Sequence, residues 1–254
     1  MNKKPLYIAS CSFGKDSLAA IALRVEQGKK VDTALYCRVM FDDGISAEFP
    51  EHEEWIHNHA IPLLKARYGV HTVIVQSPST YCRQFYTRYG SGVKSGQYYG
   101  FPMLRGPWCN SRLKLPPLRK WQRENSPYIS ILGIAADEFV RIQRSGAGER
   151  LLPLVERGMT EKECFDFCRK RDLLSPAYKG GRMRLGCWFC HNQRIGELRR
   201  LRREYPVLWR RLLDMEKDSF RTFKPNRTLR EFDEQFSNED AQLCIFKDKE
   251  LIAC

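Results

Sequence analysis

A short segment of small residues and one lysine follows the first apolar run of the chain. The apolar run is Leu6–Ser10, and residues 12–17 then read Ser-Phe-Gly-Lys-Asp-Ser before helical spacing begins. A turn from a strand into a helix directs backbone N–H groups and the positive end of the helix dipole toward an anion. Lys15 adds a cation, and Gly14 allows the backbone to approach a ligand closely. The segment therefore predicts a phosphate-binding loop, although it matches neither the Walker A nor the Gly-x-Gly-x-x-Gly pattern.

Three of the ten cysteines stand in patterns that could bind a metal. Cys187 and Cys190 form a Cys-x-x-Cys pair, and Cys109 stands alone between Trp108 and Asn110. Thiolates two residues apart can share one metal or cluster, and a distant cysteine can complete the set. We predict a metal site from these three residues. Absence of any metal and a closed zinc site remain alternatives.

The segment after the Cys-x-x-Cys pair is strongly basic. Residues 194–211 contain seven arginines, interspersed with leucines and a tryptophan at helical spacing. A continuous helix there would carry a cationic face suited to a phosphate backbone. The alternative is a solvated helix in which Glu197 and Glu204 neutralise part of that charge. We therefore predict tRNA or DNA as a partner of this helix.

The spacing of apolar residues predicts the elements that position these motifs. The expected strands are Leu6–Ser10, Thr33–Phe41, Val70–Val75 and Tyr128–Ile134. The expected helices are Lys15–Gln27, Glu51–Tyr68 and Thr160–Arg171, the last of which should begin with a capping box over residues 160–163. Strands that alternate with helices favour an α/β fold, a Rossmann-like parallel sheet with helices on both faces. We expect a nucleotide-binding domain over residues 1–155. A helical, cysteine-bearing region would follow over 156–254.

Composition narrows the class of protein. The chain has 254 residues, 43% of them hydrophobic, and a net charge of +13. A core of this size excludes global disorder, and the positive charge favours polyanionic partners. No apolar run approaches the roughly 18 residues that a membrane helix needs. We therefore expect a cytoplasmic protein without a membrane partner, in which Cys164 and Cys168 face the core rather than form disulfides.

Three segments resemble one known family. Ser-x-x-Phe-Gly-Lys-Asp-Ser at residues 10–17 resembles the pyrophosphate loop of the adenine nucleotide alpha-hydrolase superfamily, and is most similar to its phosphoadenosine phosphosulfate (PAPS) reductase branch. Asp42-Asp43-Gly44, followed by Phe-Pro-Glu at 49–51, resembles the Asp-Thr-Gly…Phe-Pro-Glu-Thr segment of that branch. Residues 133–141 resemble its Gly-Ile-Arg-x-x-Glu-Ser-x-Arg segment, with Ala135 in place of the first arginine.

The resemblance implies a set of site residues. It implies that Lys15, Asp16 and Asp42 act in catalysis and that Asp42 holds ribose or Mg²⁺. It implies that the nucleotide is bound by Ser10, Ser12, Phe13, Gly14, Lys15, Asp16, Ser17, Asp42, Gly133 and Arg141. Adenosine phosphosulfate (APS) reductases of the family hold a 4Fe–4S cluster on a tandem cysteine pair and a Cys-x-x-Cys. This chain has only Cys109 at the first position, as in sulfur-transferring relatives whose three thiolates leave one iron open.

These expectations combine into one functional hypothesis. The protein would be an enzyme that binds ATP, or a related adenine nucleotide, with Mg²⁺, transfers AMP to a substrate and releases pyrophosphate. Sulfur would then displace AMP on a nucleic acid, with an iron–sulfur cluster at the three cysteines and a sulfur donor protein as a further partner. One alternative is an APS or PAPS reductase, for which no nucleophilic cysteine is evident. The other is a non-catalytic nucleic-acid-binding module with structural zinc, which Ala135 favours.

Overall fold

The computed structural model describes residues 4–103, 106–145, 150–182 and 184–251. Its internal contacts divide the chain into two units that interleave in sequence. The sheet unit comprises Met1–Thr80 and Asn110–Cys187, and the helical unit comprises Tyr81–Cys109 and Trp188–Cys254. The division at residue 155 stays a prediction, because these units are defined by contacts rather than by independent folding.

A five-stranded parallel sheet forms the centre of the sheet unit. The strands are β1 (Leu6–Cys11), β2 (Thr33–Arg38), β3 (His71–Gln76), β4 (Tyr128–Leu132) and β5 (Arg150–Leu151). Their order is β3-β2-β1-β4-β5, and every neighbouring pair is parallel. Apolar residues of the central strands, such as Ile8 and Ala34, are fully buried because helices cover the sheet.

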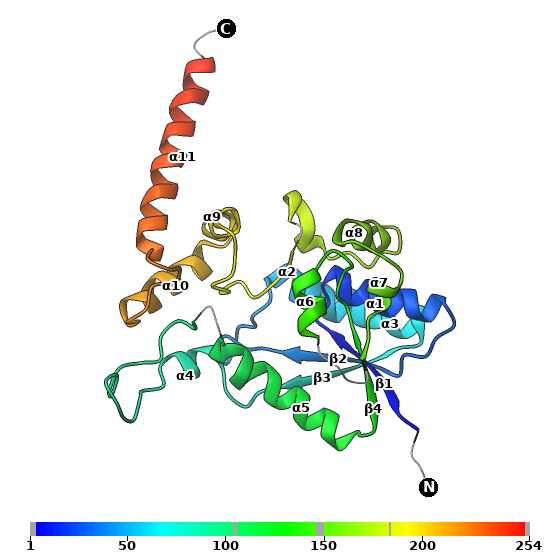
Figure 1. Ribbon diagram of the computed structural model, residues 1–254. Coiled ribbons are helices and arrows are strands. Elements are labelled where there is room, and N and C mark those ends of the chain that lie inside the picture. Colours follow the sequence, from blue (N-terminus) through cyan, green and yellow to red (C-terminus); the bar gives the residue numbers. More distant parts are fainter. Residues whose placement is uncertain (1–3, 104–105, 146–149, 183, 252–254) are drawn as a thin grey trace. The chain divides into compact units, whose positions relative to one another are not determined.

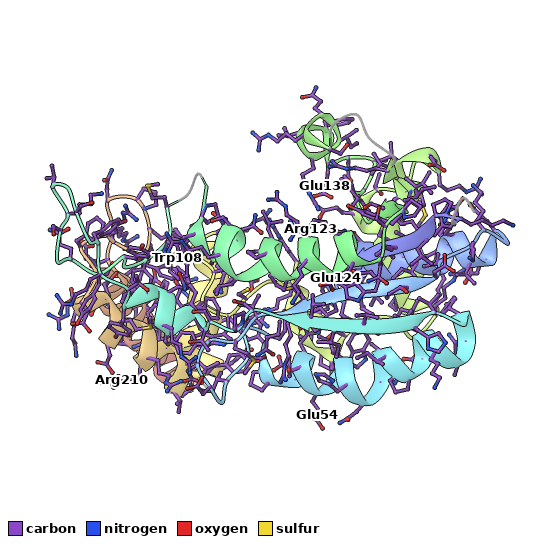
Figure 2. All side chains as sticks on the ribbon, turned by 90° about the horizontal axis from the view of Figure 1, so that it is seen from below. Glu54, Trp108, Arg123, Glu124, Glu138 and Arg210 are labelled. Carbon is purple, nitrogen blue, oxygen red and sulfur yellow. The ribbon has the colours of Figure 1, made fainter. Side chains whose placement is uncertain are left out.

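Helices flank this sheet on both faces, as the alternating pattern predicted. The α-helices of the sheet unit are α1 (Lys15–Glu26), α2 (Pro50–Trp55), α3 (Ile61–Tyr68), α5 (Leu115–Glu124), α6 (Phe139–Arg144), α7 (Pro153–Glu156) and α8 (Glu161–Arg169). Figure 1 shows α1 beside α7 and α8, with which it also packs. Figure 2 places Glu54 of α2 and Arg123 of α5 on opposite sides of the strands. The Rossmann-like α/β class is therefore confirmed.

The expected helix Glu51–Tyr68 is interrupted in the structure. A π-helical turn over Ile56–Ala60 separates α2 from α3, whose second residue is Pro62. Proline has no N–H and its ring crowds the carbonyl four residues earlier, so the backbone before it must widen. The expected capping box of α8 is confirmed, since Thr160 Oγ1 accepts the N–H of Glu163 and Glu163 accepts the N–H of Thr160.

The helical unit is built from α4 (Tyr81–Phe85), α9 (Ile195–Glu204), α10 (Pro206–Lys217) and α11 (Leu229–Leu251). The prediction of one continuous basic helix over 194–211 is wrong. The chain turns at Tyr205, with φ −133° and ψ 62°, because Pro206 cannot continue a helix from the preceding turn and instead begins α10. None of the helices within the described residues is long and apolar enough to cross a membrane.

Candidate functional site

The loop between β1 and α1 lies at the point where the strand order of the sheet changes direction. Strands β2 and β3 extend the sheet on one side of β1, whereas β4 and β5 extend it on the other. Open parallel sheets bind ligands outside the carboxyl ends of their strands at such a switch point. The predicted phosphate loop therefore lies at the position where sheets of this kind bind ligands.

Side chains of the loop hold its backbone in place. The Ser17 hydroxyl accepts the N–H of Ser12 at 3.3 Å and donates to the carbonyl of Gly14 at 2.9 Å. Phe13 has a left-handed φ of 54°, and its buried ring packs edge-on against Tyr36 with centroids 5.1 Å apart. A phenylalanine keeps a positive φ only where its surroundings hold it, as binding loops do. Ser10, also predicted to bind nucleotide, lies on β1 before this loop.

Lys15 is buried within an acidic cluster. Its side chain is 2% exposed, and its ammonium lies 2.9 Å from Asp16 Oδ1 and 3.3 Å from Glu161 Oε1. Burial lowers the pKa of Lys15, but the two carboxylates raise it more, so the amine stays charged. Burial raises the pKa of Asp16, and Lys15 offsets this only in part. The structure brings Lys15 and Asp16 together and adds Glu161, which the sequence analysis missed.

Gly133 allows the end of β4 to approach the first turn of α1. A Cβ at Gly133 would lie 2.5 Å from the carbonyl oxygen of Asp16 and 2.6 Å from the Cα of Ser17. Side chains essentially never approach backbone atoms so closely, so only glycine fits here. Because Gly133 has no side chain, the loop after β4 can lie directly against the phosphate loop.

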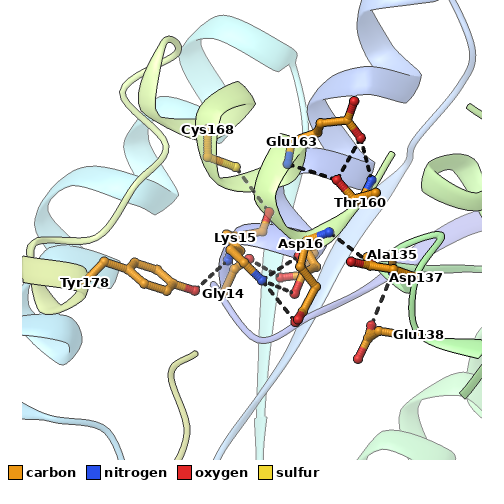
Figure 3. Close-up of polar contacts among 12 residues, drawn as sticks. Gly14, Lys15, Asp16, Ala135, Asp137, Glu138, Thr160, Glu163, Cys168 and Tyr178 are labelled. Atoms are coloured by element: carbon orange, nitrogen blue, oxygen red, sulfur yellow. Dashed lines mark hydrogen bonds and ion pairs between the residues drawn. The ribbon is translucent and has the colours of Figure 1, made fainter. Parts of the chain in front are cut away.

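The other predicted residue of this segment is already paired. Arg141 Nη1 lies 2.6 Å and 2.7 Å from the two carboxylate oxygens of Glu138, one helical turn away. Glu138 also accepts the N–H of Ala135 at 3.2 Å, and Asp137 accepts the N–H of Glu161 at 3.0 Å (Figure 3). The loop after β4 is thus tied to the start of α8, and its acids face the same region as Asp16.

Tyr178 also reaches the loop, although no motif pointed to it. It lies in a short 3₁₀ segment, Pro176–Gly181, and its hydroxyl accepts the N–H of Lys15 at 2.9 Å (Figure 3). The Cys168 thiol donates to the carbonyl of Lys15 at 3.1 Å. These contacts join residues more than 150 positions apart, so local spacing carried no signal for them.

Asp42 caps the turn that follows β2. Its Oδ1 accepts the N–H groups of Gly44 and Ile45 at 2.9 Å and 2.8 Å. This Asx-turn is the ordinary structural use of an aspartate in such a loop. Its predicted role in holding ribose or Mg²⁺ stays a prediction.

A buried acid that the sequence analysis did not single out lies near this turn. Burial raises the pKa of Glu48 to about 7, while Lys114 lowers it, Glu53 raises it and Tyr36 lowers it. The Nε2 of His52 lies 3.8 Å from Glu48 Oε2, and burial lowers the pKa of His52 to about 4. Near neutral pH, His52 is therefore uncharged, whereas the Glu48 carboxyl gains or loses its proton.

The cysteines differ in burial as expected. Cys164 and Cys168 are fully buried and unpaired, which confirms that they face the core. Cys109, Cys187 and Cys190 are partly exposed. Over the described residues, no group of three or more His, Cys, Asp or Glu side chains is placed to hold a metal ion. We therefore assign no reaction step to a metal at these cysteines.

Acidic residues of α11 neutralise much of the basic face of α9. Arg202 lies 2.8 Å from Asp233 and 3.0 Å from Asp240, and Arg203 also pairs with Asp240. Arg199 lies 2.5 Å from Glu239. The partners expected from the sequence, such as Glu204, lie within the basic segment itself, whereas these acids lie on another helix. The cationic face is therefore smaller than the arginine count implied.

No protein-family model matches the chain. A similar protein is an uncharacterized protein of Methanocaldococcus jannaschii, 27% identical over 219 residues, which cover 82% of this chain and 40% of the relative. The chain thus spans less than half the length of that relative. The name of the relative carries no activity, so function must be argued from the site.

Proposed function

We propose that the sheet unit binds an adenine nucleotide at the loop between β1 and α1 and transfers its adenylyl group, releasing pyrophosphate. The observation that carries the proposal is the position of residues 12–17 at the switch point of the sheet and the N-terminus of α1. Backbone N–H groups and the helix dipole favour an anion there. The likeness of the loop to the pyrophosphate loop of the PAPS reductase family supports ATP or a related nucleotide as the ligand.

In the proposed reaction, an acceptor oxygen attacks the α-phosphorus and forms a new P–O bond. The bond to the bridging oxygen breaks, and pyrophosphate leaves with the electron pair. Loop N–H groups and Lys15 would stabilise the charge that develops on the leaving group. Because Lys15 is paired with Asp16 and Glu161, an incoming phosphate must compete with those carboxylates for the ammonium.

Asp16 and Asp42 are the acids that we propose for Mg²⁺. Magnesium prefers carboxylate oxygens and is held by one or two of them together with substrate phosphates. It would supply charge neutralisation on the phosphates. Asp16 lies in the first turn of α1, and Asp42 follows β2, the strand adjacent to β1. Replacing either by asparagine should weaken ATP binding more in the presence of Mg²⁺ than in its absence.

ATP–pyrophosphate exchange tests the enzyme hypothesis. We expect exchange when tRNA or DNA is present, and a loss of at least tenfold in Lys15→Met. Lys29→Met is the matched control, because Lys29 is half-exposed and its ammonium lies 4.0 Å from the carboxylate of half-exposed Glu156. Unchanged nucleotide affinity in Lys15→Met would reject the loop assignment. Nucleotide binding without exchange on any acceptor would favour the non-catalytic module.

The proposal extends to a nucleic acid as the acceptor of the adenylyl group and to the sulfur transfer that follows. The net charge of +13 supports a polyanionic acceptor, while the ion pairs between α9 and α11 reduce the contribution of that face. Binding of tRNA and of duplex DNA should weaken steeply with salt. Adenosine phosphosulfate turnover with a thiol reductant would instead identify a reductase.

The identity of the metal is a separate prediction. Anaerobically prepared protein that is brown and contains iron and sulfide would support a cluster at Cys109, Cys187 and Cys190. Colourless protein with one zinc per chain would replace the cluster by a structural site. Serine in place of Cys187 should remove the metal in both cases, whereas serine at buried Cys164 should leave it bound.

A further inference from the structure

Tyr178 places a hydroxyl on the phosphate loop from a distant part of the sheet unit. The side chain is 5% exposed, and its oxygen accepts the N–H of Lys15 at 2.9 Å (Figure 3). Lys15 begins α1, and first-turn N–H groups have no acceptor within their own helix. Tyr178 therefore occupies one of the donors that such a loop offers to an anion.

The proton of this hydroxyl has no acceptor among the residues that the structure describes, where the bond from Lys15 is the one hydrogen bond that the Tyr178 hydroxyl makes. Burial raises the pKa of Tyr178, and the nearby carboxylates of Asp16 and Glu161 raise it further, so the phenol keeps its proton. A buried donor left without an acceptor is destabilising. An anionic oxygen beside Tyr178 would remove that penalty.

A second hydroxyl lies next to the same position. A Cβ at Gly14 would be 3.5 Å from Ser12 Oγ and 3.6 Å from the Tyr178 hydroxyl oxygen. Because Gly14 has no side chain, both hydroxyls flank the space beside its Cα. Two hydroxyl donors and the helix N-terminus thus converge where a phosphate oxygen would approach the loop.

Neighbouring residues fix the position of Tyr178. Its ring packs edge-on against Phe165, with centroids 5.7 Å apart. The segment begins at Ser175, whose hydroxyl accepts the N–H of Ala177 at 3.2 Å and lies 2.8 Å from Nδ1 of buried His52. A hydroxyl held in this way is oriented before a ligand arrives, which lowers the cost of binding.

We propose that Tyr178 is a phosphate-binding residue of the nucleotide site. Its hydroxyl accepts the N–H of Lys15 and donates its proton to a phosphate oxygen of the ligand, with Ser12 as a second donor. The ligand class is a compound that carries a pyrophosphate group, such as a nucleoside triphosphate. This inference rests on the proposed function, since it requires a phosphate at this loop.

Calorimetric titration of Tyr178→Phe with inorganic pyrophosphate and with ATP tests the inference. The substitution removes the hydroxyl and keeps the ring against Phe165. We expect affinity for both ligands to fall about tenfold, the effect of losing one hydrogen bond to a charged group. Tyr128→Phe is the matched control, because Tyr128 begins β4, at the opposite end of the strands from the loop, and should bind as the wild type does.

The outcomes separate the inference from the proposed function. If the wild type binds these ligands and Tyr178→Phe binds them equally well or more tightly, the role of Tyr178 is overturned but the proposed function is not. Tighter binding by the variant would mean that the hydroxyl competes with the ligand. A wild type that binds neither pyrophosphate nor ATP overturns the proposed function and this inference together. Should Tyr178→Phe fail to fold, fluorotyrosine at position 178, a stronger donor, must tighten binding; unchanged or weaker binding rejects the inference.

Discussion

The carboxylates of the two units differ in what controls their charge. In the sheet unit, burial raises the pKa of Asp16 despite the adjacent Lys15, and burial raises that of Glu48 to about 7. In the helical unit, a hydrogen bond from Arg203 lowers the pKa of Asp240, as an exposed ion pair does. Both units contain ion pairs, and the pair of Lys15 with Asp16 in the sheet unit includes a side chain that is only 2% exposed.

The difference agrees with the place proposed for the nucleotide site. Partly exposed ion pairs such as those between α9 and α11 contribute little to stability, about 0–1 kcal/mol each. Desolvated groups such as Lys15 and Glu48 are held at a cost, and perturbed groups of this kind cluster at functional sites. Their place at the carboxyl ends of β1 and β2 agrees with the site proposed from the loop.

The largest expected effect comes from the close packing beneath the loop. Gly133→Ala should destabilise the protein by about 3 kcal/mol or more, because the new Cβ would overlap the backbone of Asp16 and Ser17. Denaturant unfolding measures the change. Gly90→Ala is the control, since a Cβ there meets nothing within 4 Å. Equal stability of the two variants would contradict the close approach.

Breaking the buried ion pair should have the next largest effect. Lys15→Met should cost about 2–3 kcal/mol, less than a fully buried pair would, because Asp16 remains 21% exposed. The loss should shrink when Asp16→Asn is added, since the uncompensated carboxylate is then gone. A double-mutant cycle by chemical unfolding measures that coupling. Additive losses would show that the two side chains do not interact.

Glu48 predicts a pH dependence of stability. The pKa of Glu48 is raised from its ordinary value of 4.5 to about 7 in the folded protein. The contribution of the protonated carboxyl to folding stability is therefore fully present below pH 4.5 and is lost as the pH rises through 7. Glu48→Gln should therefore be more stable than the wild type at pH 8, by about 2 kcal/mol, and similar to it at pH 4.5. Unfolding midpoints across this range provide the measurement, and a pH-independent difference would refute the prediction.

The smallest effect is expected in the helical unit. Arg202→Met should cost less than about 1 kcal/mol, although Arg202 contacts both Asp233 and Asp240, because these two carboxylates are 37% and 33% exposed to water. Raising the salt concentration should reduce the difference from wild type further. A loss as large as that in Lys15→Met, measured by thermal unfolding, would remove the contrast between the units.

Several features could be read from local sequence because local chemistry decides them. The alternation of apolar runs with helical spacing was enough to predict four strands and the α/β class. The Thr160–Glu163 capping box formed as predicted, since both partners lie within one helical turn. Cys164 and Cys168, four residues apart on α8, face the core as helical periodicity requires.

Contacts between distant segments were decided only by tertiary structure. The pairing of Lys15 with Glu161, the close approach of Gly133 to α1 and the contact of the Tyr178 hydroxyl with Lys15 each join segments more than 100 residues apart. Tertiary structure also decided which acids of α11 pair with the arginines of α9. Amino-acid order determined which residues could bind an anion, because strand, turn and helix N-terminus are local. Packing decided which buried charged side chains have a partner of opposite charge, because burial and ion pairing depend on neighbours that the fold brings together.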